Sequence, residues 1–278
     1  MSLNYDLHSH SNVSDGALSP TELVRRAHRN GVDVFSLTDH DEVKGLNEAA
    51  QAARACGMRF VPGVEISVTW ANKTLHVVGL NIDPDNPLLI EGLRKTREGR
   101  QQRARQIAAS LAEQGIEDMY EAALAHVGNP ALMSRTHFAR ALVERQICGS
   151  ISEVFTRFLS EGKPGYVPMT WARLEEALEW ILQAGGQPVI AHPGRYDYTP
   201  MQADALYDVF LQLGGTGIEV VTGSHTPEQY REYADVAQRY GFLASCGSDF
   251  HAPNESRIDL GGLPPLPARL RPIWQAWS

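Results

Sequence analysis

The sequence predicts an α/β fold in which a parallel sheet closes into a (β/α) barrel of seven strands. Short apolar strand patterns alternate with amphipathic helical patterns along most of the 278 residues. The seven strand patterns begin at Tyr5, Val34, Phe60, Leu75, Val189, Ile218 and Leu243. Between residues 86 and 163 only helical patterns occur. We therefore expect residues 1–85 and 164–278 to form the barrel, and residues 86–163 to form an inserted helical subdomain.

The first helix has a clear start signal. Ser19 is expected at the N-cap, Pro20 at the first helical position and Glu22 as the partner that completes a capping box. Gly31 ends this helix, and residues 32–37 then form a short buried strand.

An Ala-rich helix over residues 43–56 comes next, followed by strands over residues 59–66 and 74–80. Each of these two strands carries one His or carboxylate, Glu65 or His76, among mostly apolar residues. An inward-facing side chain at such a position can reach the mouth of a barrel.

Four helical patterns fill the predicted insertion, over residues 88–115, 118–126, 134–145 and 151–158. Residues 94–105 hold six Lys or Arg against one Glu, which gives this segment a charge of +5. Such a run either attracts a phosphate-bearing substrate or forms a solvated helix face, and the second role is the commoner one.

After Gly165 the alternation of strands and helices returns. Helices are expected over residues 174–184, 201–213 and 227–240, and strands over residues 187–191, 217–221 and 243–247. This part of the chain therefore supplies the last three strands of the barrel.

Composition excludes several classes of protein. A formal net charge of −8 argues against a surface that binds polyanions over the whole molecule. The three cysteines are far apart and form no CxxC, so neither a disulfide framework nor a thiolate zinc site is predicted. We see no signal peptide and no apolar run long enough to span a membrane, and we expect a cytoplasmic protein.

Histidines and carboxylates gather at the predicted strand ends. His8 and His10 project to the same side of a strand, and Asp15 follows a turn-prone run. Because the carboxyl ends of barrel strands meet at one rim, these side chains are expected to form one site. The candidate metal ligands are His8, His10, Asp15, His40, Glu65, His76, His192, Asp249 and His251. Six His and three carboxylates exceed the needs of one ion, and they suit zinc, iron or manganese rather than calcium.

Other polar residues have simpler interpretations. A single His in a strand, such as His76, is more often a hydrogen-bonded core residue than a ligand. His28 and His126 are expected at the surface or in packing. Asp39 and Asp41 are expected either to cap the following helix or to orient His40.

Five ordered motifs between Tyr5 and His251 resemble those of the PHP (polymerase and histidinol phosphatase) family of amidohydrolase-like barrels. They are Asp6–His10 with Ser14–Gly16, Thr38–Asp41, Gly63–Ile66, Ala191–Pro193 and Ser248–His251. The helical insertion, Gly162–Tyr166 and His192–Arg195 further resemble the subgroup of nucleoside 3′,5′-bisphosphate phosphatases, whose relatives also trim 5′-phosphorylated RNA.

This resemblance implies a distorted (β/α)7 barrel with a three-metal site, usually of manganese, iron or zinc. It implies one ion held by His8, His10, Glu65 and Asp249, a second by Glu65, His76 and His192, and a third by Asp15, His40 and His251. Glu65 is then the bridging carboxylate.

Clustered divalent ions activate water and hold phosphoryl oxygens, so phosphoester hydrolysis is the expected chemistry. Glu65, His192 and Arg195 are the predicted catalytic residues, with Arg195 placed to bind the phosphate. The residues expected to bind the rest of the substrate are Ser134, Arg135, Thr136, His137 and Lys163.

The expected reaction is removal of the 3′-phosphate from a nucleoside 3′,5′-bisphosphate, as the resemblance implies. Three alternatives stay open at this point. They are a 5′-to-3′ exonuclease that acts on short RNA, a histidinol phosphatase, and a metal-loaded module that binds nucleic acid without catalysis.

Overall fold

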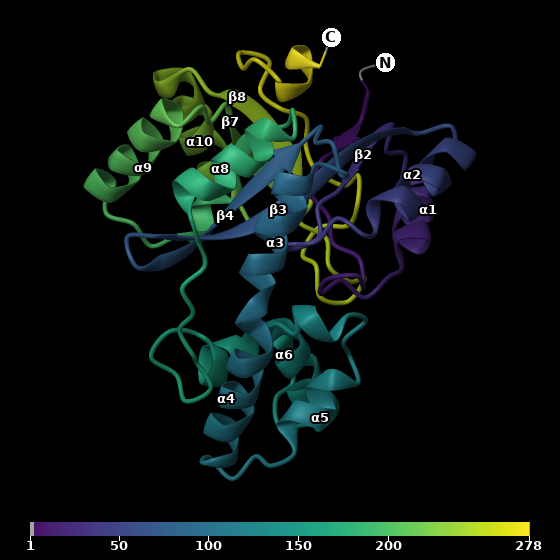
Figure 1. Ribbon diagram of the computed structural model, residues 1–278. Helices are drawn as coiled ribbons and strands as arrows, with labels where there is room; N and C mark the ends of the chain where they lie inside the picture. Colours follow the sequence, from purple (N-terminus) through teal and green to yellow (C-terminus); the bar gives the residue numbers. More distant parts are fainter. Residues whose placement is uncertain (1–2, 278) are drawn as a thin grey trace.

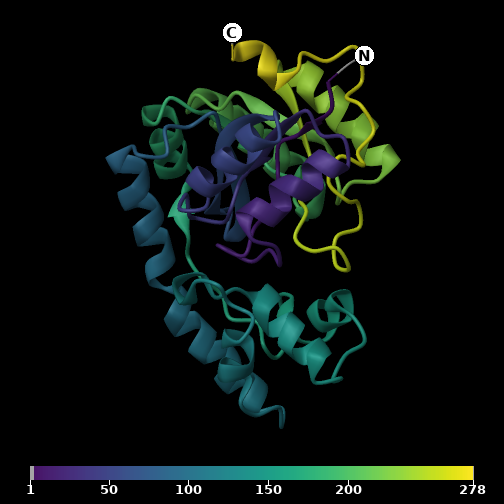
Figure 2. The ribbon, with the colours of Figure 1, turned by 90° about the vertical axis from the view of Figure 1, so that its right-hand side faces the viewer.

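A computed structural model describes residues 3–277 and shows a barrel with a helical insertion at one end (Figures 1 and 2). The strands follow one another around the barrel in the order β1 (Tyr5–Asp6), β2 (Val34–Leu37), β3 (Arg59–Trp70), β4 (Lys73–Leu80), β6 (Gln187–Ile190), β7 (Gly217–Thr222) and β8 (Leu243–Gly247). Backbone hydrogen bonds join β8 to β1, with Leu7 N donating to Cys246 O at 3.0 Å. The predicted seven-stranded barrel is therefore confirmed.

Strand β4 departs from the expected parallel arrangement. It runs antiparallel to both β3 and β6, because Ala71 and Asn72, with φ of 46° and 62°, form a tight left-handed turn after β3. The start of β4 thus lies at the same rim as the ends of the other strands. His76, paired with Ser67 of β3, reaches this rim from inside its strand.

A further short strand, β5 (Ala172–Arg173), pairs with β3 and was not predicted. The helices that surround the barrel are α1 (Pro20–Arg29), α2 (Leu46–Ala55), α8 (Leu174–Gln183), α9 (Pro200–Gln212) and α10 (Pro227–Tyr240). The capping box of Ser19 and Glu22 is present at the start of α1, as expected.

Alternation along the strands creates two apolar cores. In β2, Phe35 belongs to the core between the sheet and its helices, whereas its neighbour Val34 belongs to a second cluster with Leu7 and Val189. Ile273 near the C-terminus also packs in this second cluster. Apolar side chains therefore fill one end of the barrel, and the polar residues lie at the opposite end.

The insertion comprises α3 (Pro87–Glu98), α4 (Arg100–Ala112), α5 (Met119–Leu124), η1 (Pro130–Leu132), α6 (Arg135–Glu144), α7 (Ile151–Val154) and η2 (Phe155–Leu159). The single helix predicted over residues 88–115 is therefore two helices that meet at Gly99. Ile107 of α4 packs in a separate core of the insertion, while Leu89 of α3 packs in the main core of the barrel. The boundaries at residues 86 and 163 stay a prediction.

Both views place α4, α5 and α6 at the end of the barrel opposite the two chain termini (Figures 1 and 2). The contacts between this insertion and the loops that follow the strands position the site described next.

Candidate metal centre

All nine predicted ligands converge at the rim of the barrel that faces the insertion. Four overlapping groups of them bring one nitrogen or oxygen from each residue within 4.8 Å of the others. The groups are His10, Asp15, His40 and His251; His8, His10 and Asp249; His8, Glu65 and His192; and His40, Glu65 and His76.

The first predicted set is compact. His10 Nε2 lies 3.1 Å from His8 Nε2, 3.3 Å from Glu65 Oε2 and 3.2 Å from Asp249 Oδ1. The side chains of His8, His10 and Glu65 are fully buried. These donor atoms face one another across a gap that suits one cation.

The second set gathers around the other oxygen of Glu65. Glu65 Oε1 lies 2.9 Å from His192 Nε2 and 3.0 Å from His76 Nδ1. The two imidazole nitrogens are 3.4 Å apart. Glu65 therefore presents one carboxylate oxygen to each set, which is the geometry of a bridging ligand.

The third set is more open. Asp15 Oδ1 lies 3.4 Å from His251 Nε2 and 3.8 Å from His40 Nε2. The other ring nitrogen of His40, Nδ1, is 2.9 Å from Glu65 Oε2. His40 thus lies between the third set and the bridging carboxylate.

The donor set fits divalent cations. Asp15 Oδ1, His40 Nδ1 and Glu65 Oε2 are buried atoms that make no hydrogen bond of acceptable geometry among the described residues, although His40 Nδ1 and Glu65 Oε2 lie 2.9 Å apart. Buried polar atoms are rarely left in that state, and lone pairs that converge without donors between them are typical of a metal site.

The protonation states of Glu65 and His10 suit metal binding, whereas at His8 and His40 the nearby carboxylates outweigh burial and raise the pKa of the imidazole. Burial opposes ionisation of Glu65, but the nearby imidazoles of His76, His40 and His8 outweigh it and hold the pKa of that carboxyl well below its usual range. Burial, together with the charge of His251, lowers the pKa of His10 to about 3. An ionised carboxylate and a neutral imidazole are the forms that bind metal.

Glu219 on β7 supports two of the ligands, and sequence analysis missed it. Its Oε1 accepts a hydrogen bond from His8 Nδ1 at 2.7 Å, which directs His8 Nε2 toward the cluster. Its Oε2 accepts from the backbone N–H of His192 at 2.6 Å, where the backbone has a left-handed φ of 27°. A carboxylate within an apolar strand was the available signal, as it was for Glu65.

Tyr196 supports the second set. Its hydroxyl accepts from the backbone N–H of His76 at 2.9 Å and lies 3.2 Å from His192 Nδ1. Tyr196 directly follows Arg195. The loop after β6 therefore carries the ligand His192 and also Tyr196, which orients that ligand.

Asp39 and Asp41 organise loops instead of capping a helix. Asp39 accepts from Ser11 N at 2.8 Å and from Ser14 Oγ at 2.6 Å, and so fixes the turn that carries Asp15. Asp41 accepts from Ser67 N at 2.8 Å. Helix α2 begins at Leu46, with Gly45 at its N-cap and no side-chain cap, so capping, one of the two expected roles of Asp39 and Asp41, was wrong. His28 is exposed, and His126 pairs with Glu144, as expected for packing or surface residues.

A cavity of about 110 Å³ adjoins the ligands and has walls from both the barrel and the insertion. Ser134, Arg135, Thr136 and Arg195 line it, as does Phe155. A second cavity of about 320 Å³ shares Thr136, Phe155 and Arg195 with the first. The two cavities therefore meet beside the metal ligands.

Two of the predicted substrate-binding residues lie elsewhere. His137 is fully buried in the insertion, where its Nδ1 accepts from Ser134 N at 2.9 Å and completes a capping box for α6. Lys163 is exposed to solvent and lines neither cavity.

Four arginines, Arg100, Arg103, Arg135 and Arg195, line the smaller cavity. Arg195 Nη1 lies 3.0 Å from Asp249 Oδ2, and Arg100 pairs with Asp41. In the described part of the chain, Arg103 and Arg135 donate to the carbonyls of Val167 and Leu159, and neither forms an ion pair.

The surroundings of these two arginines disfavour their charge. Burial, followed by the charges of Arg135 and Arg100, lowers the pKa of Arg103 to about 9. Burial also lowers the pKa of Arg135, and Arg195 and Arg100 add to this effect while Tyr166 opposes it. Cations held together without counter-charges favour binding of an anion.

Comparison with known proteins identifies the family. A model of the PHP domain matches residues 6–222, which include seven of the nine ligand candidates. The chain belongs to the PHP domain family.

Two kinds of relative resemble this PHP protein along nearly its whole length. A 3′,5′-nucleoside bisphosphate phosphatase from Chromobacterium violaceum is 49% identical over 98% of this chain and 95% of its own. The 5′-3′ exoribonuclease Rnm from Salmonella typhimurium is 39% identical over 99% of this chain and 94% of its own.

Solved structures agree with this assignment. An amidohydrolase from Chromobacterium violaceum, with bound sulfate and no metal, superposes with a TM-score of 0.96 at 49% identity, over 98% of this chain and 95% of its own. A protein from Bifidobacterium adolescentis, provisionally classed as a metal-dependent phosphoesterase, gives a TM-score of 0.83 at 27% identity, over 100% of this chain and 95% of its own.

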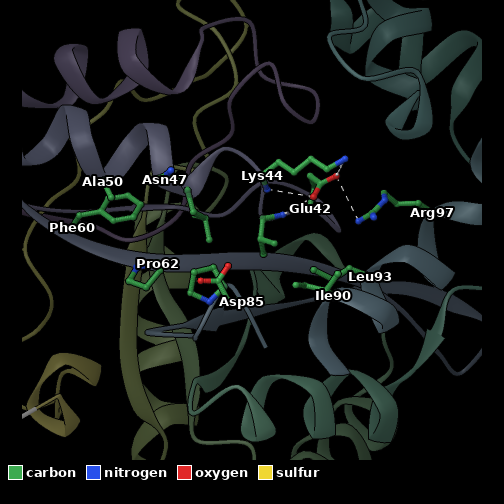
Figure 3. Close-up of a pocket in the computed structure, with 13 residues that line it drawn as sticks. Glu42, Lys44, Asn47, Ala50, Phe60, Pro62, Asp85, Ile90, Leu93 and Arg97 are labelled. Carbon is green, nitrogen blue, oxygen red and sulfur yellow. Dashed lines mark hydrogen bonds and ion pairs between the residues drawn. The ribbon is translucent and has the colours of Figure 1, made fainter. Parts of the chain in front are cut away.

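The PHP protein has another cavity, of about 700 Å³, whose lining includes residues of α2, β3 and α3 (Figure 3). Phe60 and Leu93 form part of its apolar wall, and Glu42 lies near Lys44 and Arg97 at its edge (Figure 3). It contains none of the nine ligand candidates. Within residues 3–277, every helix is too short or too polar to cross a membrane.

Proposed function

We propose that this PHP protein is a metal-dependent phosphatase that removes the 3′-phosphate of nucleoside 3′,5′-bisphosphates. The observation that carries this proposal is the placement of Arg103 and Arg135, two arginines without ion-pair partners among residues 3–277, in the lining of one small cavity with the metal ligands. Such a cavity suits a substrate with two phosphates, one for the metal centre and one for the arginines. The bisphosphate phosphatase relative acts on a substrate of this kind.

We propose three divalent ions, one for each predicted ligand set. The overlap of the four ligand groups and the two-sided contacts of Glu65 support this number. Manganese is the metal we expect, and iron and zinc suit the same imidazole and carboxylate donors. The cytoplasmic location stays a prediction.

When bound, such ions polarise phosphoryl oxygens and lower the pKa of coordinated water. The protein's own contribution is position and charge. Arg195 is held by Asp249 Oδ2 at 3.0 Å, while half of its side chain stays exposed and lines both cavities. Its remaining N–H groups can donate to an oxygen of the 3′-phosphate.

The 5′-phosphate is assigned to the insertion side of the cavity. Arg103 and Arg135 supply the charge and Thr136 supplies a hydroxyl group, whereas the hydroxyl of Ser134 in the same lining already donates to Asp15 Oδ2. His137 and Lys163 lie outside both cavities, so we assign them no direct contact with the substrate.

A second candidate function is 5′-to-3′ exonuclease activity on short RNA. The larger cavity of about 320 Å³ opens from the same centre and is lined by polar residues that include Ser224, Ser256 and Arg257. It offers space for the nucleotide that follows the scissile phosphate. The Rnm relative supports this candidate. Nothing in the lining specifically favours histidinol phosphate, and the relatives favour an enzyme over a non-catalytic nucleic-acid-binding module.

A substrate panel tests the proposal. We expect the Mn²⁺-loaded protein to release phosphate from adenosine 3′,5′-bisphosphate at least about 10-fold more efficiently than from 3′-AMP, because two charge-assisted contacts are lost with the 5′-phosphate. A 5′-phosphorylated oligoribonucleotide and histidinol phosphate complete the panel. Equal kcat/KM for the bisphosphate and 3′-AMP would overturn the assignment of the two arginines.

A further inference from the structure

The third ligand set differs from the other two because side chains of the insertion contact the loops that carry its ligands. Asp15, His40 and His251 lie in the loops that follow β1, β2 and β8. Each loop contacts the insertion. Ser134, at the start of α6, donates from Oγ to Asp15 Oδ2 at 3.1 Å. Arg100 of α4 forms a buried ion pair with Asp41, the residue after His40.

Arg140 of α6 supplies the contact to the His251 loop. Its Nε and Nη2 donate to the two carboxylate oxygens of Glu255, both at 2.8 Å. The next residue, Ser256, accepts from the backbone N–H of His251 at 2.8 Å. The ion pair between Arg140 and Glu255 is therefore linked by one hydrogen bond, at the neighbouring Ser256, to His251, a ligand of the third set.

A backbone contact reinforces the Asp15 loop. Gly128, between α5 and η1, packs so closely on the barrel that a Cβ at this position would lie 2.1 Å from the carbonyl oxygen of Asn12. Asn12 belongs to the same turn as Asp15. Only glycine fits here, so the insertion and this loop are in direct backbone contact.

The barrel itself holds the first and second sets. Glu219 of β7 bonds both His8 and the backbone of His192. Glu65 and His76 lie within paired strands, and Tyr196 bonds the backbone of His76. Arg195 and the backbone of His8 hold Asp249.

We propose that docking of the insertion completes the third metal site, and that the first two sites form on the barrel without it. This inference rests on the three-ion centre proposed above. It follows by linkage that binding of the third ion also stabilises the docked position of the insertion. The protein then has two tightly held ions and a third whose affinity depends on contacts from α4 and α6.

The test is Mn²⁺ binding to the full-length apoprotein, measured by equilibrium dialysis with elemental analysis. Arg140→Ala removes one contact between insertion and barrel without touching a ligand. We expect wild type to bind three ions, and the variant to keep two at unchanged affinity while the third weakens about 10-fold or more, the usual effect of losing a residue that supports a metal ligand.

Two further variants guard this test against simple misfolding. Arg157→Ala breaks an ion pair with Glu153 inside the insertion and should leave all three affinities unchanged. The double exchange Arg140→Glu with Glu255→Arg restores a pair of opposite charges and should recover much of the third site. Circular dichroism and thermal melting check that each variant is folded.

Unchanged binding of three ions by folded Arg140→Ala would overturn the inference, and so would equal weakening of all three sites. Wild-type protein that binds only two ions would instead refute the three-ion centre. Protection of the insertion from proteolysis should rise on addition of the third equivalent of Mn²⁺. Protection that is complete after the first two equivalents would contradict the proposed linkage.

Discussion

The carboxylate of Glu219 lies 2.7 Å from His8 Nδ1, and both side chains are fully or almost fully buried at the centre of the barrel. This hydrogen bond fixes which nitrogen of His8 faces the other ligands. The second oxygen of Glu219 holds the backbone of His192, so one side chain orients ligands of two sets.

We expect Glu219→Gln to weaken Mn²⁺ binding at the first and second sites by about 10- to 100-fold. The amide keeps one acceptor for His8, but it cannot accept from both partners, and its charge is lost. Metal content after dialysis measures the effect. An unchanged affinity for Mn²⁺ at these two sites would contradict the role of Glu219 in orienting the ligands.

Arg135→Ala should raise KM for adenosine 3′,5′-bisphosphate by about 10-fold or more and change kcat/KM for 3′-AMP little, because a charged hydrogen bond contributes roughly 1.5–3 kcal/mol. Arg105→Ala is a matched control, since Arg105 is an exposed arginine of the insertion that lines neither cavity. A similar rise in both variants would mean that general electrostatic attraction, not a phosphate site, is responsible.

The buried ion pair between Arg100 and Asp41 is expected to matter for stability. Arg100→Ala leaves a fully buried carboxylate that keeps only its bonds to Ser67. Removal of one partner from such a pair typically costs 3–5 kcal/mol, so chemical denaturation should show a loss of about that size. The double variant Arg100→Met with Asp41→Asn should lose less free energy of unfolding, because it leaves no unpaired buried charge. An equal loss in the two variants would argue against an uncompensated charge as the cause.

His137 predicts a pH dependence of stability. Burial lowers its pKa to about 4, against 6.5 for an ordinary histidine, so the unfolded chain binds the proton more tightly than the folded chain. The contribution of neutral His137 is complete above pH 6.5 and is lost as the pH falls toward 4, by about 3 kcal/mol in the limit.

His137→Gln provides the measurement, because glutamine retains an acceptor for the capping box of α6 but does not titrate. The free energy of unfolding of this variant should depend less on pH than that of wild type between pH 6.5 and 4. Parallel curves for the two proteins would assign the acid sensitivity to other groups.

Much of the centre could be predicted from sequence because its ligands follow simple placement rules. His8 and His10 lie two residues apart just after β1, and His192 and Asp249 likewise follow strand ends. The antiparallel direction of β4 was not foreseen, since the turn at Ala71 and Asn72 lacks the glycine that usually marks a tight hairpin.

Other features depend on packing that a linear pattern does not contain. In the basic segment, Arg94 pairs with Glu91 and Glu98 at the surface, whereas Arg100 and Arg103 face the cavity. Helical periodicity shows that these residues lie on different faces, but it does not show which face the barrel covers. Glu219 was missed because no motif surrounds it, although its carboxylate interrupts an apolar strand.

The most direct test of the account is the identity of the products that Mn²⁺-loaded protein forms from adenosine 3′,5′-bisphosphate, resolved by chromatography or phosphorus NMR. We expect 5′-AMP and inorganic phosphate, with no product after metal removal and recovery of activity on addition of Mn²⁺. Formation of 3′-AMP, or unchanged turnover by protein shown to be free of metal, would contradict this expectation.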